Sequence, residues 1–276
     1  MDKTRILYVS QEITPFLPET ELSTISRQLP QGIHERGKEI RVFMPRYGKI
    51  NERRHQLHEV IRLSGMNLII NDADHPLIIK VASIPTARMQ VYFIDNEEYF
   101  HRKSVLTDED DKLHEDTDER GIFFIKGVLE TVKKLGWAPD IIHCQGWMSA
   151  LMPLYTKKLY GDDPHFSDAK IVFSAFDGAF PSPLDKGFMD KVKFDGLADE
   201  DIALLADPTF ENLNKLAIQH SDAVIQASAD IPAEVSAYIQ DTEKPFLNVG
   251  TEDNYVPEVD AFYDAVLEGK SVLIEE

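Results

Sequence analysis

The chain has 276 residues, of which 43% are hydrophobic and 28% charged, a balance typical of a globular protein with a sizeable core. With 29 basic and 48 acidic residues, its net charge of −19 makes binding to nucleic-acid phosphates or to anionic membranes unfavourable. We therefore predict that the protein binds neither nucleic acid nor membrane. The chain has one cysteine, Cys144, and a charged N-terminus, and it contains no signal-peptide core and no membrane-spanning run. These features predict a cytoplasmic protein.

The first 45 residues predict a strand, a helix and a second strand. Residues 4–10 and 39–45 are short apolar runs typical of buried parallel strands. Between them, apolar residues recur with the period of one helix face, at Leu22, Ile25, Leu29 and Ile33. Gly37 is placed to end that helix. This order indicates a right-handed βαβ unit, the building block of a parallel sheet.

Residues 57–96 differ, because their β-rich runs lack intervening segments long enough for crossover helices. We expect an antiparallel excursion here, with a turn at residues 71–76. Its predicted runs cover residues 57–63, 66–70, 77–84 and 89–95.

An acidic segment follows, with eight carboxylates between Asp108 and Glu119. It lacks the glycine and the ligand spacing of a calcium loop. Since blocks of like charge usually stay in water, we interpret it as a solvated loop that leads into a helix. We therefore assign no metal and no cofactor to the chain.

Strands and helices alternate through the rest of the chain. The predicted elements are a helix at 122–132, a strand at 139–144, a helix at 147–160, a strand at 169–176, a helix at 213–220, a strand at 221–228 and a helix at 231–240. We predict one α/β domain over residues 1–276, a Rossmann-like, doubly wound and mostly parallel sheet with the antiparallel excursion. Such sheets bind ligands outside the carboxyl ends of their strands, here the loops that begin at Ser10, His143 and Phe176.

Two neighbouring residues at the end of the 139–144 strand carry reactive groups, His143 and Cys144. Adjacent side chains on a strand point to opposite faces, so they cannot form a catalytic pair, and buried packing is the favoured role of Cys144. For His143 a structural role and a ligand contact both stay open. Trp147 is equally suited to core packing and to stacking on a sugar. The long loop at 176–188 suits the lip of a cleft or a plain connector.

Several segments match the motifs of one enzyme family in order and spacing. After its first strand the family carries S-E-x-x-P-x-x-K-T-G-G-L-A-D-V, where this chain has SQEITPFLPETELSTIS. The family's P-D-I-x-H-x-H-D-W-H corresponds to PDIIHCQGWM, its T-x-H-N to SAFD, and its A-D-x-V-x-x-V-S to SDAVIQAS. The chain thus resembles, over about residues 4–240, the N-terminal domain of bacterial glycogen and starch synthases, which are retaining glycosyltransferases of the GT-B fold.

This resemblance implies cleft or sugar contacts at Glu12, Phe16, His143, Trp147 and Asp177. At other motif positions this chain has a different residue from the family. Pro18 replaces the Lys, Thr20 and Glu21 replace the paired glycines, and Thr24 replaces the Asp. Histidines of the family are replaced by Gln145, Met148 and Phe176. In the family, the Lys and the glycines approach the phosphates of the nucleotide sugar. Glu21 instead adds a negative charge, and like charges about 4 Å apart repel by roughly 1 kcal/mol in water and about 4 at an effective dielectric of 20.

The family also closes a second, C-terminal domain over the donor, and we expect no such domain in this chain, which ends at SVLIEE. The favoured hypothesis is a catalytically degenerate domain that binds an α-1,4-glucan, such as a maltooligosaccharide, or a protein partner. The first alternative is half of a split ADP-glucose-dependent glucan synthase, completed by a separate chain. The second is an interaction module unrelated to glucan, since a fold does not fix a function.

Overall fold

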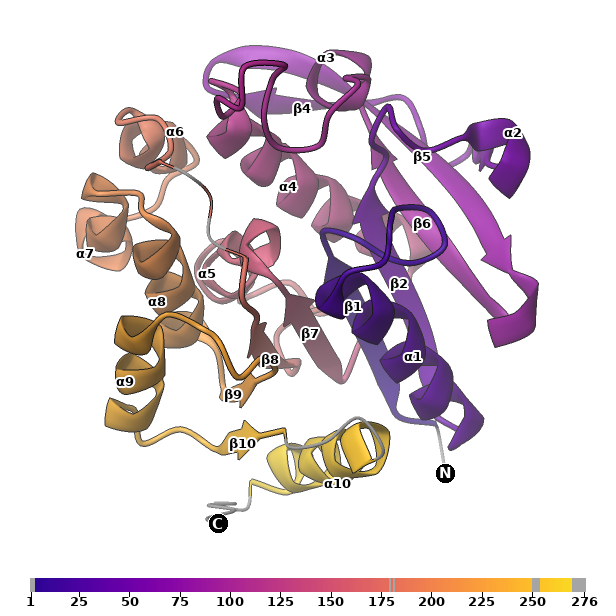
Figure 1. Ribbon diagram of the computed structural model, residues 1–276, viewed down its shortest axis with the longest axis vertical. Helices are drawn as coiled ribbons and strands as arrows, with labels where there is room; N and C mark the ends of the chain where they lie inside the picture. The colour runs from indigo at the N-terminus through magenta and orange to yellow at the C-terminus, as the bar shows by residue number, and fades with distance from the viewer. Residues whose placement is uncertain (1–2, 179, 181, 250–253, 270–276) are drawn as a thin grey trace.

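A ten-stranded mixed sheet runs through the centre of the computed structural model, which describes residues 3–178, 180, 182–249 and 254–269 (Figure 1). Its order is β10-β9-β8-β7-β1-β2-β6-β5-β3, with β4 paired to β5. The strands are β1 (Arg5–Ser10), β2 (Glu39–Pro45), β3 (His58–Glu59), β4 (Met66–Ile70), β5 (Ala73–Ile84), β6 (Met89–Asp95), β7 (Ile141–Gln145), β8 (Lys170–Ala175), β9 (Ala223–Gln226) and β10 (Phe246–Asn248). Pairing is parallel from β10 to β6 and antiparallel where β5 meets β6, β3 and β4.

Helices cover both faces of this sheet. The described α-helices are α1 (Glu21–Glu35), α2 (Glu52–His55), α3 (Glu97–Phe100), α4 (Thr117–Leu135), α5 (Leu151–Lys158), α6 (Phe188–Phe194), α7 (Asp199–Ile202), α8 (Phe210–His220), α9 (Ala233–Asp241) and α10 (Tyr255–Leu267). The path β1–α1–β2 moves across the sheet in one direction and β7–α5–β8 in the other, so right-handed crossovers place α1 and α5 on opposite faces. The prediction of a doubly wound, mostly parallel sheet is confirmed.

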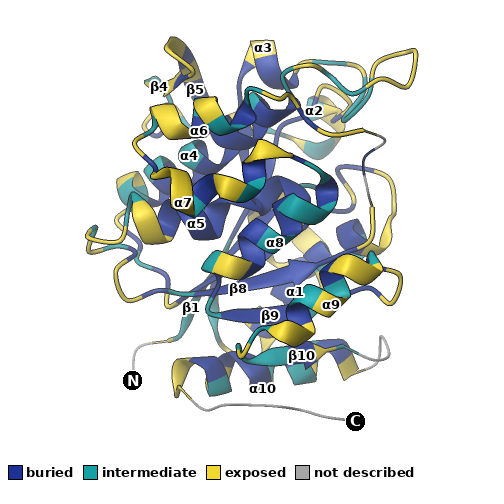
Figure 2. Ribbon diagram, turned by 90° about the vertical axis from the view of Figure 1, so that its left-hand side faces the viewer, coloured by how far each residue is buried: buried dark blue, intermediate teal, exposed yellow. Residues whose placement is uncertain are grey.

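The core lies between the sheet and these helices. The strands in the middle of the sheet are buried along almost their whole length, and the exposed residues lie on the outer sides of the helices (Figure 2). α4, α5 and α8 pack side by side, and α1 packs against α10. None of the helices in the described ranges is both long enough and apolar enough to cross a bilayer.

The antiparallel excursion is present, but its internal limits differ from the prediction. The expected turn at 71–76 is a two-residue turn, because Ile70 already pairs with Ala73 across the β4–β5 hairpin. Asn71 and Asp72 form it with φ of 45° and 68°, the left-handed backbone that tight hairpins require.

The run at 57–63 was also predicted too long. It forms only the two-residue β3, because the chain turns where the Leu63 amide donates to the carbonyl of Val60 at 2.9 Å. The run at 89–95 is the junction of the two sheet types: β6 pairs in parallel with β2 and antiparallel with β5.

The acidic segment is only partly a solvated loop. Residues 108–111 are exposed as predicted, but α4 begins at Thr117, inside the segment. Asp116 pairs with Arg102 at 2.6 Å, and the buried Asp118 pairs with Lys191 at 2.8 Å. The solvated-loop prediction is therefore wrong for these two carboxylates, because each faces a cation from another part of the chain.

Two elements near the C-terminus were not predicted, β10 and α10. The helix lies against α1, where a Cβ added at Gly32 would be 2.6 Å from Val256. Lys38 reaches it by ion pairs with Asp260 and, at 3.0 Å, with Asp264. α10 thus covers the part of the core beside α1 with its buried face.

Candidate functional site

The carboxyl ends of β1, β7 and β8 meet at the middle of the sheet, where the direction of the crossovers reverses. A cavity of about 410 Å³ opens there. The loops after these strands, which the sequence had singled out, border it. Six of the residues named from the family motifs line this cavity: Glu12, Thr20, Glu21, Trp147, Met148 and Asp177. We call it the switch-point cavity.

The N-terminus of α1 forms one wall of the switch-point cavity, and it is capped by the chain's own side chains. Thr20 Oγ1 accepts a hydrogen bond from the Ser23 amide at 3.0 Å, and the Thr20 amide donates to Ser23 Oγ at 2.9 Å. This reciprocal pair is a capping box. The Thr20 hydroxyl in turn donates to Glu12, and burial raises the pKa of Glu12.

Glu21 adds its carboxylate to the same helix end. It accepts a hydrogen bond from the hydroxyl of Ser228, just beyond β9. A carboxylate in the first turn is favourable for the helix, since it complements the positive end of the macrodipole. The helix end that could hold an anion is therefore already supplied with a negative charge.

The opposite wall is built from the turn that follows β7. Trp147 is 6% exposed, and its ring meets the ring of Phe180 edge-on at 5.2 Å, so it is largely a packing residue that also borders the cavity. Met148 is buried, and its sulfur accepts a hydrogen bond from the Tyr47 hydroxyl at 3.2 Å. Its amide donates to Gln11 Oε1 at 3.2 Å.

At the mouth of the cavity stands Asp177, an exposed residue just after β8. Its Oδ1 accepts a hydrogen bond from the Gly178 amide at 2.7 Å. Together with Glu12 and Glu21, it gives the cavity three carboxylates that can accept hydrogen bonds from hydroxyl groups.

Other named residues lie elsewhere. Phe16 is buried against Phe93, and Phe176 is buried beside Asp177.

Three further motif positions also lie outside the cavity. Pro18 is exposed, and Thr24 borders a separate cavity of about 480 Å³ on the far side of Glu21. Gln145 is fully buried, and among the described residues its side-chain amide has no hydrogen-bond partner. These residues do not touch the switch-point cavity.

His143 and Cys144 are both fully buried. The His143 ring lies between two hydroxyls, with Nε2 at 2.6 Å from Ser174 Oγ and Nδ1 bonded to Tyr263 of α10. Both ring nitrogens are thus used inside the core, so we leave His143 out of the candidate site. Burial also raises the pKa of the Cys144 thiol, which fits packing rather than nucleophilic chemistry.

We predict that His143 makes the protein less stable in mild acid. Burial lowers the pKa of the His143 imidazole to about 3, below its usual value of about 6.5. Between these two pH values the imidazole is therefore protonated in the unfolded chain but stays neutral in the folded protein. Stability is then fully present above pH 6.5 and falls as the pH drops. Between pH 7.5 and pH 5 we expect a loss of about 2 kcal/mol in the free energy of unfolding from this residue. Urea unfolding of the wild type and His143→Asn at both pH values measures it; parallel changes in the two proteins would contradict the prediction.

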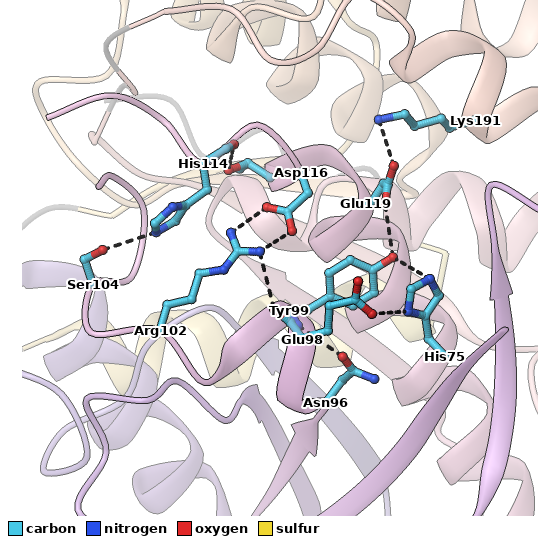
Figure 3. Close-up of polar contacts among 11 residues, drawn as sticks. His75, Asn96, Glu98, Tyr99, Arg102, Ser104, His114, Asp116, Glu119 and Lys191 are labelled. Carbon is cyan, nitrogen blue, oxygen red and sulfur yellow. Dashed lines mark hydrogen bonds and ion pairs between the residues drawn. The ribbon is translucent and has the colours of Figure 1, made fainter. Parts of the chain in front are cut away.

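Six further described residues line the cavity and were not named as site residues: Gln11, Leu22, Tyr47, Val105, Leu106 and Gly178. Tyr47 lies two residues after the end of β2, and its place beyond the carboxyl end of a strand was the available signal. Val105 and Leu106 lie in an irregular loop whose position depends on distant partners. Figure 3 shows the polar contacts around this loop, including the Arg102–Asp116 ion pair.

The polar cluster of Figure 3 continues towards α6. The Tyr99 hydroxyl lies 3.0 Å from His75 Nε2 and 3.0 Å from Glu119, and Glu119 pairs with Lys191 at 3.0 Å. Contacts from β5, α3, α4 and α6 thus hold the region beside the switch-point cavity.

Comparison with known proteins gives consistent results. The family model for the starch synthase catalytic domain matches residues 5–243. A glycogen synthase of Chlorobium limicola is 35% identical over 245 residues, covering 86% of this chain and 48% of that protein. A glycogen synthase of Pelodictyon phaeoclathratiforme is 35% identical over 238 residues, covering 84% and 47%.

The same fold occurs in a solved structure. The catalytic domain of starch synthase IV from Arabidopsis thaliana, bound to ADP and acarbose, superposes with a TM-score of 0.73. The two sequences are 17% identical, and the match covers 92% of this chain and 53% of that chain. The chain spans about half the length of the curated relatives that it matches.

Proposed function

The chain belongs to the glycogen and starch synthase family, and from this membership we propose that it is a catalytically degenerate form of the family's N-terminal domain that binds an α-1,4-glucan in the switch-point cavity. The observation that carries the proposal is the state of the α1 N-terminus. Thr20 and Glu21 stand where the family has paired glycines, and both side chains are engaged in the structure.

A nucleotide sugar brings a diphosphate, which needs positive charge and free donors around it. At this helix end the Ser23 amide is already capped by Thr20, and Glu21 contributes a carboxylate. Among the described residues that line the cavity, none is Lys, Arg or His. Charge and capping together disfavour a diphosphate in this half of the site.

A neutral sugar chain suits the same cavity better. Carboxylates accept hydrogen bonds from sugar hydroxyls without the charge repulsion that a phosphate meets. Trp147 and Tyr47 supply aromatic surface at the walls, and a volume of about 410 Å³ lies within the range of small-ligand sites. The solved starch synthase domain was bound to acarbose as well as ADP, which supports a sugar-related ligand on this fold.

A second candidate function is half of a split, ADP-glucose-dependent glucan synthase whose donor domain is a separate polypeptide. It rests on the match of the starch synthase catalytic domain to residues 5–243. It predicts a stable complex with such a polypeptide and incorporation of glucose from ADP-glucose by that complex. A complex that incorporates no glucose would leave partner binding without catalysis.

We expect Asp177→Ala to weaken maltoheptaose binding by roughly tenfold, because a hydrogen bond to a charged group contributes about 1.5 kcal/mol or more. Isothermal titration of both proteins measures the effect. Asp162→Ala is the matched control, since Asp162 is exposed beyond the C-terminal end of α5, away from the cavity. Equal maltoheptaose affinities for the wild type and both variants would contradict the proposal that the glucan binds in this cavity.

A further inference from the structure

A second cavity, of about 270 Å³, lies on the other side of the loop that borders the switch-point cavity. Pro15 and Phe16 of that loop line it, together with Arg27 of α1, residues 54–56 at the end of α2, and residues 83–86 at the end of β5. We call it the basic cavity. It contains no residue of the switch-point cavity.

Positive charge converges on the basic cavity from two separate helices. Arg27 and Arg54 line it, and within the described ranges neither forms an ion pair with a carboxylate. Arg27 is held in place by a hydrogen bond from Nη2 to Thr86 Oγ1 at 2.9 Å. The chain as a whole has a net charge of −19. The two arginines at this cavity, which have no carboxylate partner among the described residues, therefore make its surroundings locally positive.

His55 adds a third nitrogen group to the wall. Its ring packs edge-on against Phe16 at 5.0 Å, which fixes its position. Burial, and then the neighbouring charge of Arg54, lowers its pKa. Arg27 and Arg54 would stabilise an anion bound beside this imidazole, to which the ring can add one N–H hydrogen bond.

The size and the remaining lining restrict the anion. At about 270 Å³ the cavity lies just below the usual lower limit of about 300 Å³ for drug-sized ligands, which leaves room for a single sugar beside a phosphate. Gln56, Ser83 and Thr86 offer polar groups for hydroxyls, and Phe16 offers an apolar ring. We propose that the basic cavity binds the phosphate monoester of a single sugar, with Arg27 and Arg54 on the phosphate.

The contrast between the two cavities supports this assignment. Three carboxylates line the switch-point cavity, whereas the basic cavity has none among its described lining residues. The same loop borders both, so a phosphorylated sugar and a neutral glucan would occupy opposite sides of it. This inference is independent of the glucan proposal, because the two sites share no residue.

The test uses glucose 1-phosphate, free glucose and inorganic phosphate as probes in isothermal titrations at low salt. We expect glucose 1-phosphate to bind the wild type with a dissociation constant of about 1 mM or below, and roughly tenfold more weakly in Arg27→Gln/Arg54→Gln. The matched control is Arg53→Gln/Arg62→Gln, which removes the same charge from exposed positions outside the cavity and should bind as the wild type does. Thermal unfolding confirms that each variant is folded, and the single Arg54→Gln variant serves if the double variant is not.

Absence of glucose 1-phosphate binding to the wild type, or an equal loss in the control variant, would overturn the proposal. Inorganic phosphate binding as tightly as glucose 1-phosphate would overturn the assignment of a sugar. Maltoheptaose titrations of the same variants should give the wild-type affinity, so that failure here is distinguishable from failure of the glucan site.

Discussion

Trp147→Ala is expected to lower the free energy of unfolding by about 3–5 kcal/mol. Separately, it is expected to weaken maltoheptaose binding by about 1–2 kcal/mol, roughly 5- to 30-fold in the dissociation constant. The first effect follows from burial, because the indole is 6% exposed and packs against Phe180 at 5.2 Å. The second follows from the place of the ring on the wall of the switch-point cavity. Urea unfolding measures the first effect and isothermal titration the second.

A conservative variant separates the two effects. Trp147→Phe keeps an aromatic ring against Phe180 but presents less surface to the cavity, so most of the stability should be retained while part of the affinity is lost. If both variants bind maltoheptaose as the wild type does, Trp147 is a packing residue only, and the glucan does not touch this wall.

Lys191→Met is expected to cost about 3–5 kcal/mol of stability at pH 8, because it leaves a buried carboxylate without its cation. Lys191 Nζ lies 2.8 Å from Asp118 and 3.0 Å from Glu119, and the side chain of Asp118 is fully shielded from solvent. Lys193→Met is the control, since Lys193 and its partner Asp199 are both more than half exposed and should contribute under about 1 kcal/mol.

The cost of Lys191→Met should shrink in acid. Burial raises the pKa of Asp118 to about 6 even with Lys191 beside it, and loss of that cation raises the pKa further. A carboxyl group whose folded pKa is raised favours the folded state at low pH and loses that contribution as the pH rises through the folded pKa. The destabilisation measured by urea unfolding at pH 5 should therefore be smaller than at pH 8.

A double variant completes this test. Asp118→Asn removes the charge that Lys191 compensates, so Lys191→Met should cost clearly less in that background. An unchanged cost, or equal costs for Lys191→Met and Lys193→Met, would show that the Asp118 pair contributes no more than a surface pair.

Much of the fold could be predicted because its central elements have strong local patterns. β1, β2 and β7 are continuous apolar runs, and the buried face of α1 recurs with a helical period. α10 has a similar signal, with buried residues at Tyr255, Val259, Phe262 and Val266, and could have been found by extending the same reading past residue 240. β10 has only three residues, too few for any period to appear.

The place of the site was predictable, but the role of each residue was not. Parallel strands bring their carboxyl ends together, so the loops after β1, β7 and β8 meet by topology alone. The burial of His143 depends on Tyr263, which is 120 residues away in an unpredicted helix. Likewise, the pairing of Asp118 with Lys191 joins two segments that show no link in the sequence.

The central claim is that the switch-point cavity accepts a neutral glucan and not a nucleotide sugar. A thermal-shift titration of the purified chain, with maltoheptaose in one series and ADP-glucose in the other, tests it most directly. Maltoheptaose at 100 times its dissociation constant should add about 2.7 kcal/mol and raise the unfolding midpoint by roughly 5–10 °C. ADP-glucose should leave the midpoint unchanged. A shift with ADP-glucose, or no shift with maltoheptaose, would contradict the account.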